Sequence, residues 1–197
     1  GNHYVSNFVN KASIKKGVKA PLNLVYCRNC QLLQLEHSAP QEIMYKKFYW
    51  YRSGVTNTMR IALKDIFTKV EKMSLLKKGD TILDIGANDG TMLKYFKDKG
   101  YKTIGCEPAK NLTKELKKNS DFIINDFWEY KHLNNLIKKN QINKPKVITA
   151  IGMFYDLENP SKFISDAAKS LDDNGVFIAQ LMCLNSMIEQ NDLGNIC

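Results

Sequence analysis

A short stretch of acidic, amide and glycine residues offers the clearest ligand-binding chemistry of the chain. Residues 81–90 begin with an apolar run and continue with Asp84, Gly86, Asn88 and Gly90. The glycines let the backbone turn tightly and approach a ligand without a Cβ. A nicotinamide fingerprint would be G-x-G-x-x-G and would bind a pyrophosphate, whereas acidic and amide groups suit a cationic ligand. We therefore predict a cofactor loop at the end of a buried strand, in preference to a plain structural turn.

Acidic residues also end the next two predicted strands. Glu107 comes 23 residues after Asp84, a spacing that suits a carboxylate accepting both ribose hydroxyls of a nucleotide. Taken alone, it could also be a solvated side chain before a proline. Asp126 lies beside Phe127, and this pair suits an adenine amino group and ring face, although the signal is weak by itself. Gly152 follows the fourth predicted strand and would lie opposite the first loop.

Alternating helix and strand patterns must position these residues. Residues 55–76 show apolar side chains at helical spacing with a charged opposite face. Asn159 and Pro160 predict the cap and first position of a later helix, with an inner stripe of Phe163, Ile164, Ala167, Ala168 and Leu171. Strands are predicted from residue 81 and at 102–107, 121–127, 147–151 and 176–181. This β-α alternation predicts an α/β fold with a mostly parallel, doubly wound sheet.

Composition limits the function classes. The chain has 197 residues, 44% of them hydrophobic, enough for one full core and a small satellite domain. Its net charge of +9 raises the question of nucleic acid, but the lysines form scattered doublets instead of one dense stripe. We expect solvated helix faces, no nucleic-acid partner, and at most a general attraction for anionic substrates such as nucleotide-sugars. No apolar run or signal peptide suggests a membrane, so we expect a cytoplasmic protein without a membrane partner.

A C-x-x-C pair, Cys27 and Cys30, sets the N-terminal part apart from the rest. This spacing lets two thiolates reach one zinc ion, which then requires four ligands. The three other cysteines fall in the region of the predicted sheet, and His37 is the one further candidate nearby. The pair is therefore half of a metal site, a reduced pair in a small core, or a redox motif; the last lacks the expected β-α-β context.

Several motifs, in the same order along the chain, carry a resemblance to known proteins. The D-x-G-x-N-D-G pattern of residues 84–90 resembles the first motif of class I S-adenosylmethionine (SAM) methyltransferases. With the other segments it looks like the sugar C-methyltransferase family, whose members include the C-3′-methyltransferases of nucleotide-linked deoxysugars. The further segments are residues 27–35, 49–54, 58–59, 107–109, 125–127 and 174–177.

The resemblance implies a Rossmann-like class I SAM methyltransferase core in residues 55–197 and a partial zinc-binding domain in residues 1–54. SAM would be held at its methionine part by the first loop, at its ribose by Glu107, and at its adenine by Asp126 and Phe127. Cys27 and Cys30 would be one of two C-x-x-C pairs that hold a structural zinc ion. Only this second pair is present, so the site is expected to be incomplete.

The family's chemistry is C-methylation of a nucleotide-linked ketosugar. A base removes the proton beside the keto group, and the resulting enolate attacks the methyl group of SAM. Tyr49 and Tyr51 lie in a segment that resembles the family's substrate-facing tyrosines and could donate to the keto oxygen, or they could simply pack between domains. The family's proposed base lies in a histidine-glutamate-histidine motif that would follow Cys197, so we expect a truncated chain that is inactive alone. A methyltransferase for another acceptor (a sugar oxygen or nitrogen, or RNA) and a noncatalytic SAM-binding module stay open.

Overall fold

The computed structural model describes residues 2–3, 11–12, 19–21, 23–155 and 157–191. By its internal contacts the chain divides into two compact units. The larger unit, Tyr51–Leu181, contains the sheet with its helices. The smaller unit combines Gly1–Trp50 with Met182–Cys197.

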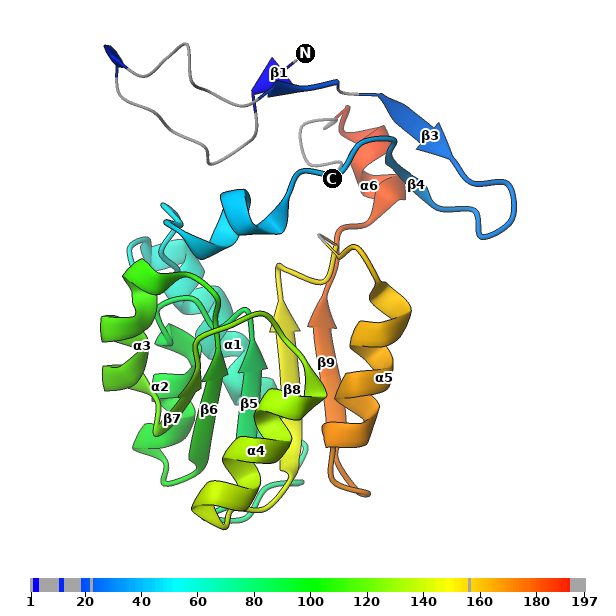
Figure 1. Cartoon of the computed structure of the whole chain (residues 1–197). Helices are drawn as coiled ribbons and strands as arrows, with labels where there is room; N and C mark the ends of the chain where they lie inside the picture. Colours follow the sequence, from blue (N-terminus) through cyan, green and yellow to red (C-terminus); the bar gives the residue numbers. More distant parts are fainter. Residues whose placement is uncertain (1, 4–10, 13–18, 22, 156, 192–197) are drawn as a thin grey trace. The chain divides into compact units, whose positions relative to one another are not determined.

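The larger unit is a five-stranded, fully parallel sheet (Figure 1). The strand order is β7-β6-β5-β8-β9, so the chain starts at the centre and winds out to one edge and then to the other. This is the doubly wound α/β topology predicted from the sequence, with ligand chemistry expected where the winding direction changes, between β5 and β8. The strands are β5 (Thr81–Ile85), β6 (Lys102–Cys106), β7 (Phe122–Ile124), β8 (Pro145–Ile151) and β9 (Val176–Gln180).

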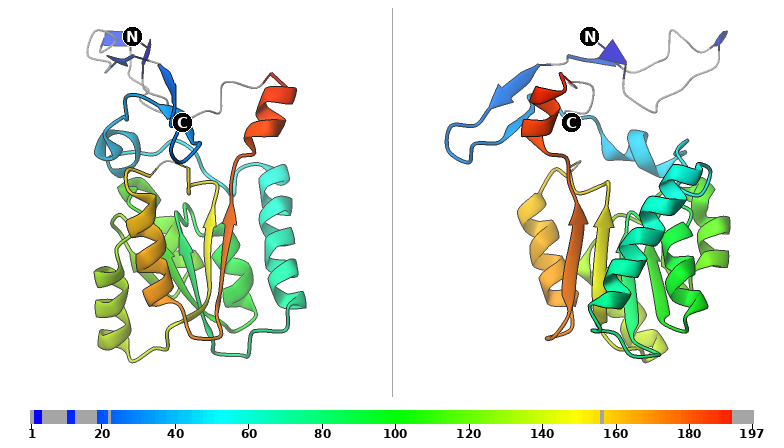
Figure 2. Two further views of the ribbon diagram at one scale, coloured as in Figure 1. Left: turned by 90° about the vertical axis from the view of Figure 1, so that its right-hand side faces the viewer. Right: turned by 180° about the vertical axis from the view of Figure 1, so that it is seen from behind.

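Helices cover both faces of this sheet (Figure 2). The hydrophobic cluster on one face joins α1, α2 and α3 to the sheet, and the cluster on the other face joins α4 and α5 to it. All five residues of β5 are buried, as expected for a central parallel strand. The helices are α1 (Asn57–Lys72), α2 (Thr91–Asp98), the 3-10 turn η3 (Lys110–Leu112), α3 (Thr113–Asn119), α4 (Tyr130–Asn140) and α5 (Pro160–Ser170).

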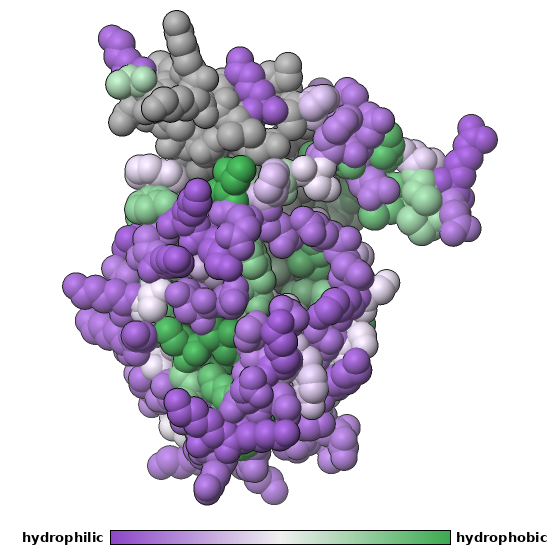
Figure 3. All heavy atoms as spheres, in the orientation of Figure 1, coloured by the Kyte–Doolittle hydropathy of each residue, from purple (hydrophilic) through white to green (hydrophobic). Residues whose placement is uncertain are grey.

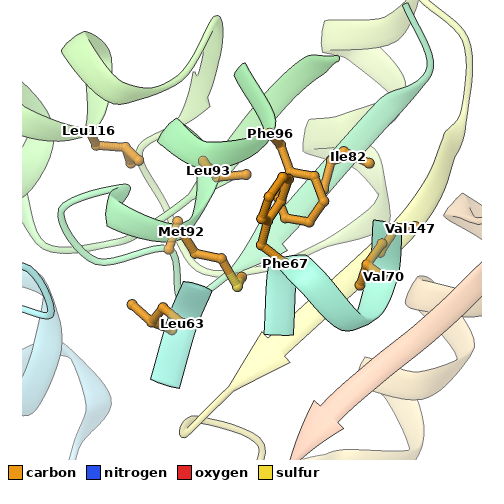
Figure 4. Close-up of a cluster of buried hydrophobic side chains, with 10 residues drawn as sticks. Leu63, Phe67, Val70, Ile82, Met92, Leu93, Phe96, Leu116 and Val147 are labelled. Carbon is orange, nitrogen blue, oxygen red and sulfur yellow. The ribbon is translucent and has the colours of Figure 1, made fainter. Parts of the chain in front are cut away.

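The first core cluster is built by α1 and α2 against the sheet (Figure 4). Leu63, Phe67 and Val70 form the buried stripe of α1, and the ring of Phe67 meets that of Phe96 edge to face at 4.9 Å. The helix is shorter than residues 55–76, because Thr56 caps its start and Ser74 adopts a left-handed φ of 55° after its end. Val55 precedes the cap and is 68% exposed, so its prediction as part of the stripe was wrong.

Helix α5 confirms the predicted cap and corrects the predicted stripe. Asn159 Oδ1 accepts a hydrogen bond from Lys162 N–H at 2.9 Å, with Pro160 at the first position. Phe163 and Ala167 are buried, but Ile164 is 43% exposed and Ala168 is exposed as well, so both were wrongly predicted to face inward. Polar Asp166 takes the stripe position instead, because its carboxylate accepts hydrogen bonds from Tyr130 N–H at 3.1 Å and from Lys162 Nζ at 2.7 Å.

In the part of the smaller unit that the structure describes, the elements are short. Strands β3 (Leu24–Tyr26) and β4 (Leu33–Leu35) form an antiparallel hairpin, and β1 (Asn2–His3) pairs with β2 (Lys19–Ala20). A π-helix, η2 (Glu42–Lys46), and helix α6 (Leu184–Glu189) complete the described elements.

No helix in the described part of the chain is long and apolar enough to cross a membrane. The face in Figure 3 is largely hydrophilic, in keeping with solvated lysine-rich helix faces.

Candidate functional site

Three of the five residues 86–90 in the loop after β5 have a left-handed backbone conformation. Gly86, Asn88 and Gly90 have φ values of 75°, 52° and 76°. The loop is tied to the end of the neighbouring strand, because the N–H groups of Gly86 and Ala87 both donate to the carbonyl of Cys106, at 2.9 and 3.1 Å. A Cβ at Gly86 would lie 2.8 Å from Cγ of Met153. The loops after β5 and β8 therefore meet closely at the point where the winding direction changes.

Asp84 is a buried acid at the centre of the sheet. It occupies the fourth position of β5, and Thr149 of β8 donates its hydroxyl to Asp84 Oδ1 at 2.6 Å. Burial raises the pKa of Asp84 to about 7, and the nearby charge of Glu107 acts in the same direction, while the hydrogen bond from Thr149 opposes the rise. The carboxyl group is therefore near the balance between its neutral and charged forms at neutral pH.

Glu107 lies at the end of β6 and is 5% exposed. Its Oε2 accepts a hydrogen bond from Asn88 N–H and its Oε1 accepts one from Ala109 N–H, each at 2.9 Å. Burial raises the pKa of this carboxyl, and the two backbone hydrogen bonds oppose the rise. A carboxylate has about four acceptor positions, so Glu107 keeps the capacity to accept hydrogen bonds from a ligand.

Asp126 and Phe127 lie half-buried in the loop after β7. Asp126 Oδ1 accepts a hydrogen bond from Phe127 N–H at 2.9 Å, and Cys106 Sγ donates to the Asp126 carbonyl at 3.4 Å. The adjacent Trp128, to which the sequence analysis gave no role, has a buried indole Nε1 that finds no hydrogen-bond partner among the described residues. The one sequence feature that could have drawn attention to Trp128 is its position directly after Asp126 and Phe127.

Residues 51–54 lie against the loop after β5. Ser53 N–H donates to Asn88 Oδ1 at 2.9 Å, and Asn88 Nδ2 donates to the Tyr51 carbonyl at 3.0 Å. Gly54 N–H donates to Asp89 Oδ2 at 2.8 Å. The sequence placed Asn88 in the cofactor loop but gave no role to Asp89, and it did not predict that this loop binds residues 51–54.

The two tyrosines belong to different units. Tyr51 is 42% exposed in the sheet unit, where partial burial and the charge of Asp89 raise its pKa. Tyr49 is in the smaller unit, with its ring 5.5 Å from that of Tyr45. Gly152, in the loop after β8, has a φ of 63°, and a Cβ at this position would make ordinary contact with Gln180 Oε1 at 3.9 Å.

Cys27 and Cys30 form a tight knuckle at the turn of the β3–β4 hairpin. Cys27 N–H donates to the Leu32 carbonyl at 2.9 Å, and Gln31, with a φ of 60°, returns its N–H to the Cys27 carbonyl at 2.8 Å. Hydrogen bonds from the backbone of Cys30 and Asn29 lower the pKa of the Cys27 thiol. Thiolate character suits metal ligation. Among the described residues, however, no three or more His, Cys, Asp or Glu side chains gather into a metal-binding group.

Comparison with known proteins identifies the domain. Residues 58–195 match the family model described as a methyltransferase domain. C-methyltransferase NovU from Streptomyces niveus is 29% identical over 92 residues, which are 47% of this chain and 22% of that protein. The chain therefore spans about a fifth of the length of this relative.

Two solved structures share the fold. The plantazolicin methyltransferase BpumL, in complex with SAH and a desmethylPZN analogue, is 19% identical, with a TM-score of 0.52 over 73% of this chain and 54% of that one. The PH0226 protein from Pyrococcus horikoshii OT3 is 16% identical, with a TM-score of 0.51 over 72% of this chain and 62% of that one. The fold is the Rossmann-like fold of class I SAM methyltransferases, and the chain belongs to the methyltransferase domain family.

Proposed function

We propose that this chain binds SAM at the carboxyl edge of its sheet and supplies the cofactor site of a methyltransferase. The observation that carries the proposal is a pair of buried carboxyl groups, Asp84 and Glu107, whose pKa values are raised by burial. Within the described part of the chain, neither forms an ion pair with a lysine or arginine. Buried carboxylates are costly without a counter-charge. A ligand that carries its own cations and no phosphate fits this site.

The cofactor's parts can be assigned to named residues. Asp84, Gly86, Asn88 and Gly90 would hold the methionine part, with Asn88 shaping the loop, because its N–H already bonds Glu107 and its side chain bonds Tyr51 and Ser53. Glu107 would accept the ribose hydroxyls. Asp126 and Phe127 would contact the adenine, and Gly152 would border the pocket from the loop after β8. When bound, SAM supplies an electrophilic methyl group.

For the acceptor we propose a nucleotide-linked ketosugar that is methylated on carbon. NovU is a C-methyltransferase, and the motifs at residues 27–35 and 49–54 resemble sugar C-methyltransferases. In this chemistry a base takes the proton from the carbon beside the keto group, and hydrogen-bond donors stabilise the developing enolate oxygen. Tyr49 and Tyr51 are the proposed donors. The same proposal includes a reducing, cytoplasmic setting, since the four described cysteines are free thiols.

A transfer assay tests the acceptor. The protein, in its full natural length, is incubated with methyl-labelled SAM and a panel of nucleotide-linked ketosugars, and the labelled position in the product is found by NMR. Label on a sugar carbon supports the proposal. Label on oxygen, nitrogen or RNA would replace the acceptor but keep the cofactor site. SAM binding without transfer to any acceptor would support a noncatalytic SAM-binding module for this chain.

We also propose that Cys27 and Cys30 form half of a structural zinc site, completed by thiolates outside the described residues. Four-cysteine sites leave no open position for substrate. In a form of the protein that supplies the other two thiolates, replacing Cys27 and Cys30 by serine should lower the zinc content found by metal analysis while SAM affinity stays within about twofold, because the pair belongs to the smaller unit. Equal zinc content in both proteins would contradict this assignment.

A further inference from the structure

Asn88 bonds in two directions at once. Its backbone N–H donates to Glu107 Oε2 at 2.9 Å, while its side chain bonds Tyr51 and Ser53. The left-handed φ of 52° is what lets one residue do both. Asn is among the few residues other than glycine that adopt this conformation at modest cost. A single residue therefore connects the proposed ribose ligand to residues 51–54.

Asp89 adds a second attachment beside the first. Its Oδ2 accepts a hydrogen bond from Gly54 N–H at 2.8 Å, and its Oδ1 accepts from both the N–H and the hydroxyl of Thr91, at 3.1 and 2.6 Å. Asn119 Nδ2 in turn donates to the Asp89 carbonyl at 2.8 Å. The side chain of Asp89 thus fixes residues 51–54 to the start of α2.

The backbone of Gly54 approaches this loop too closely for any other residue. A Cβ at position 54 would lie 2.6 Å from Oγ1 of Thr91 and 2.9 Å from Oδ2 of Asp89. Arg52 adds an ion pair to Glu115 of α3 at 3.0 Å. Residues 51–54 are therefore held by the side chains of Asn88 and Asp89, by the close packing of Gly54 against the loop, and by the ion pair of Arg52.

We propose that Asn88 and Asp89 are positioning residues that join residues 51–54 to the cofactor loop, so that SAM binding at Glu107 and the placement of Tyr51 depend on one hydrogen-bonded unit. This inference rests on the proposed SAM site. Tyr51 is carried by the same backbone that Asn88 Nδ2 binds, at its own carbonyl. A cofactor held by Glu107 would act on that backbone through the hydrogen bond between Glu107 Oε2 and Asn88 N–H. The Asn88 side chain then passes the effect on to residues 51–54.

The decisive variant is Gly54→Ala, which changes no residue of the loop. The added Cβ must push residues 51–54 away from Asp89 and Thr91, so that the hydrogen bonds between these segments are lost or stretched. We expect SAM to bind about tenfold more weakly, measured by calorimetry on the whole chain. Val55→Ala is the matched control, since its side chain is exposed and adjacent; its affinity should stay within about twofold of wild type.

A double variant separates positioning from a general loss of stability. If residues 51–54 act through Asn88 on Glu107, then Gly54→Ala should weaken SAM binding by less than about threefold when Glu107→Gln is already present, because coupled sites are not additive. A merely structural role would give the same fold-change in both backgrounds. Asp89→Asn provides a second variant of nearly the same shape, which keeps one acceptor oxygen instead of two, and it should weaken SAM binding in the same direction.

The outcomes distinguish the two levels of the argument. A wild-type chain that does not bind SAM would overturn the proposed function itself. A wild-type chain that binds SAM, together with Gly54→Ala and Asp89→Asn proteins that bind it as tightly as Val55→Ala, would overturn only the positioning role. Equal effects of Gly54→Ala with and without Glu107→Gln would also overturn it.

Discussion

Glu107 offers the sharpest test of the proposed cofactor site. Each of its oxygens already accepts one backbone hydrogen bond at 2.9 Å, which leaves about two acceptor positions for ribose hydroxyls. Glu107→Gln keeps the shape of the side chain but replaces one oxygen by an NH₂ group that cannot accept. A hydrogen bond to a charged group contributes roughly 1.5–3 kcal/mol. Since 1.4 kcal/mol is about tenfold in affinity, the dissociation constant for SAM should rise by roughly tenfold to a hundredfold.

The assay should change the ligand as well as the protein. Calorimetry is carried out with S-adenosylhomocysteine and with its 2′,3′-dideoxy analogue, for wild type and for Glu107→Gln. Wild type should lose affinity when the ribose hydroxyls are absent, and the variant should lose much less, because its contact to them is already weakened. An equal loss in both proteins would refute the ribose assignment.

A stability measurement completes this test. The new amide of Glu107→Gln must face either Asn88 N–H or Ala109 N–H, and two donors then oppose each other. The unfolding temperature without ligand is therefore expected to fall. A lower unfolding temperature with unchanged SAM affinity would mean that Glu107 holds the loop and does not contact the cofactor.

Three further predictions follow from the same site. Gly86→Ala and Gly79→Ala both force alanine into a left-handed φ, which costs about 1–2 kcal/mol, but only at Gly86 does the new Cβ lie 2.8 Å from another side chain. Denaturant titration should therefore show the larger loss of stability for Gly86→Ala. Calorimetry should show a loss of SAM affinity for Gly86→Ala alone. Asp84 has a pKa raised from 3.8 to about 7, so between these pH values the unfolded chain is ionised while the folded chain stays protonated, and its contribution to the free energy of unfolding falls as pH rises. Asp84→Asn should therefore gain stability relative to wild type as pH rises from about 4 to 7, and equal pH profiles would contradict the raised pKa. Tyr49→Phe and Tyr51→Phe should lower turnover in the transfer assay more than SAM affinity, since the hydroxyls would contact a charge that develops during the reaction; full turnover in both would make them packing residues.

The sheet could be predicted from the sequence because its strands are short apolar runs separated by helical patterns. Buried parallel strands need side chains that are apolar on both faces, and β5 and β8 have them. Element ends were less predictable. The inner stripe of α5 was misjudged at Ile164 because Asp166, a polar residue, is buried where its carboxylate accepts a hydrogen bond from Tyr130 N–H of α4 and one from Lys162 of its own helix. The contact with Tyr130 spans 36 residues and leaves no local periodicity.

The contact between residues 51–54 and the cofactor loop could not be predicted for a similar reason. Both segments stood out in the sequence, one by its acidic and glycine pattern and the other by its aromatic residues. Their contact spans 35 to 37 residues and depends on the backbone N–H and carbonyl groups of residues 51, 53 and 54, which carry no sequence signal of their own. Only the folded backbone shows that Ser53 and Gly54 present their N–H groups to Asn88 and Asp89.

This contact also explains why position 88 of the cofactor loop is asparagine and not glycine. Position 88 has a φ of 52°, a conformation in which glycine would be the residue with least strain. Glycine at 88 would keep the turn and the backbone hydrogen bond to Glu107, but it would remove the side-chain hydrogen bonds to Tyr51 and Ser53. Asn meets both requirements, since it tolerates the left-handed conformation and carries a donor and an acceptor on a short side chain. The departure from a glycine-rich fingerprint is thus the local consequence of attaching a second segment to the loop.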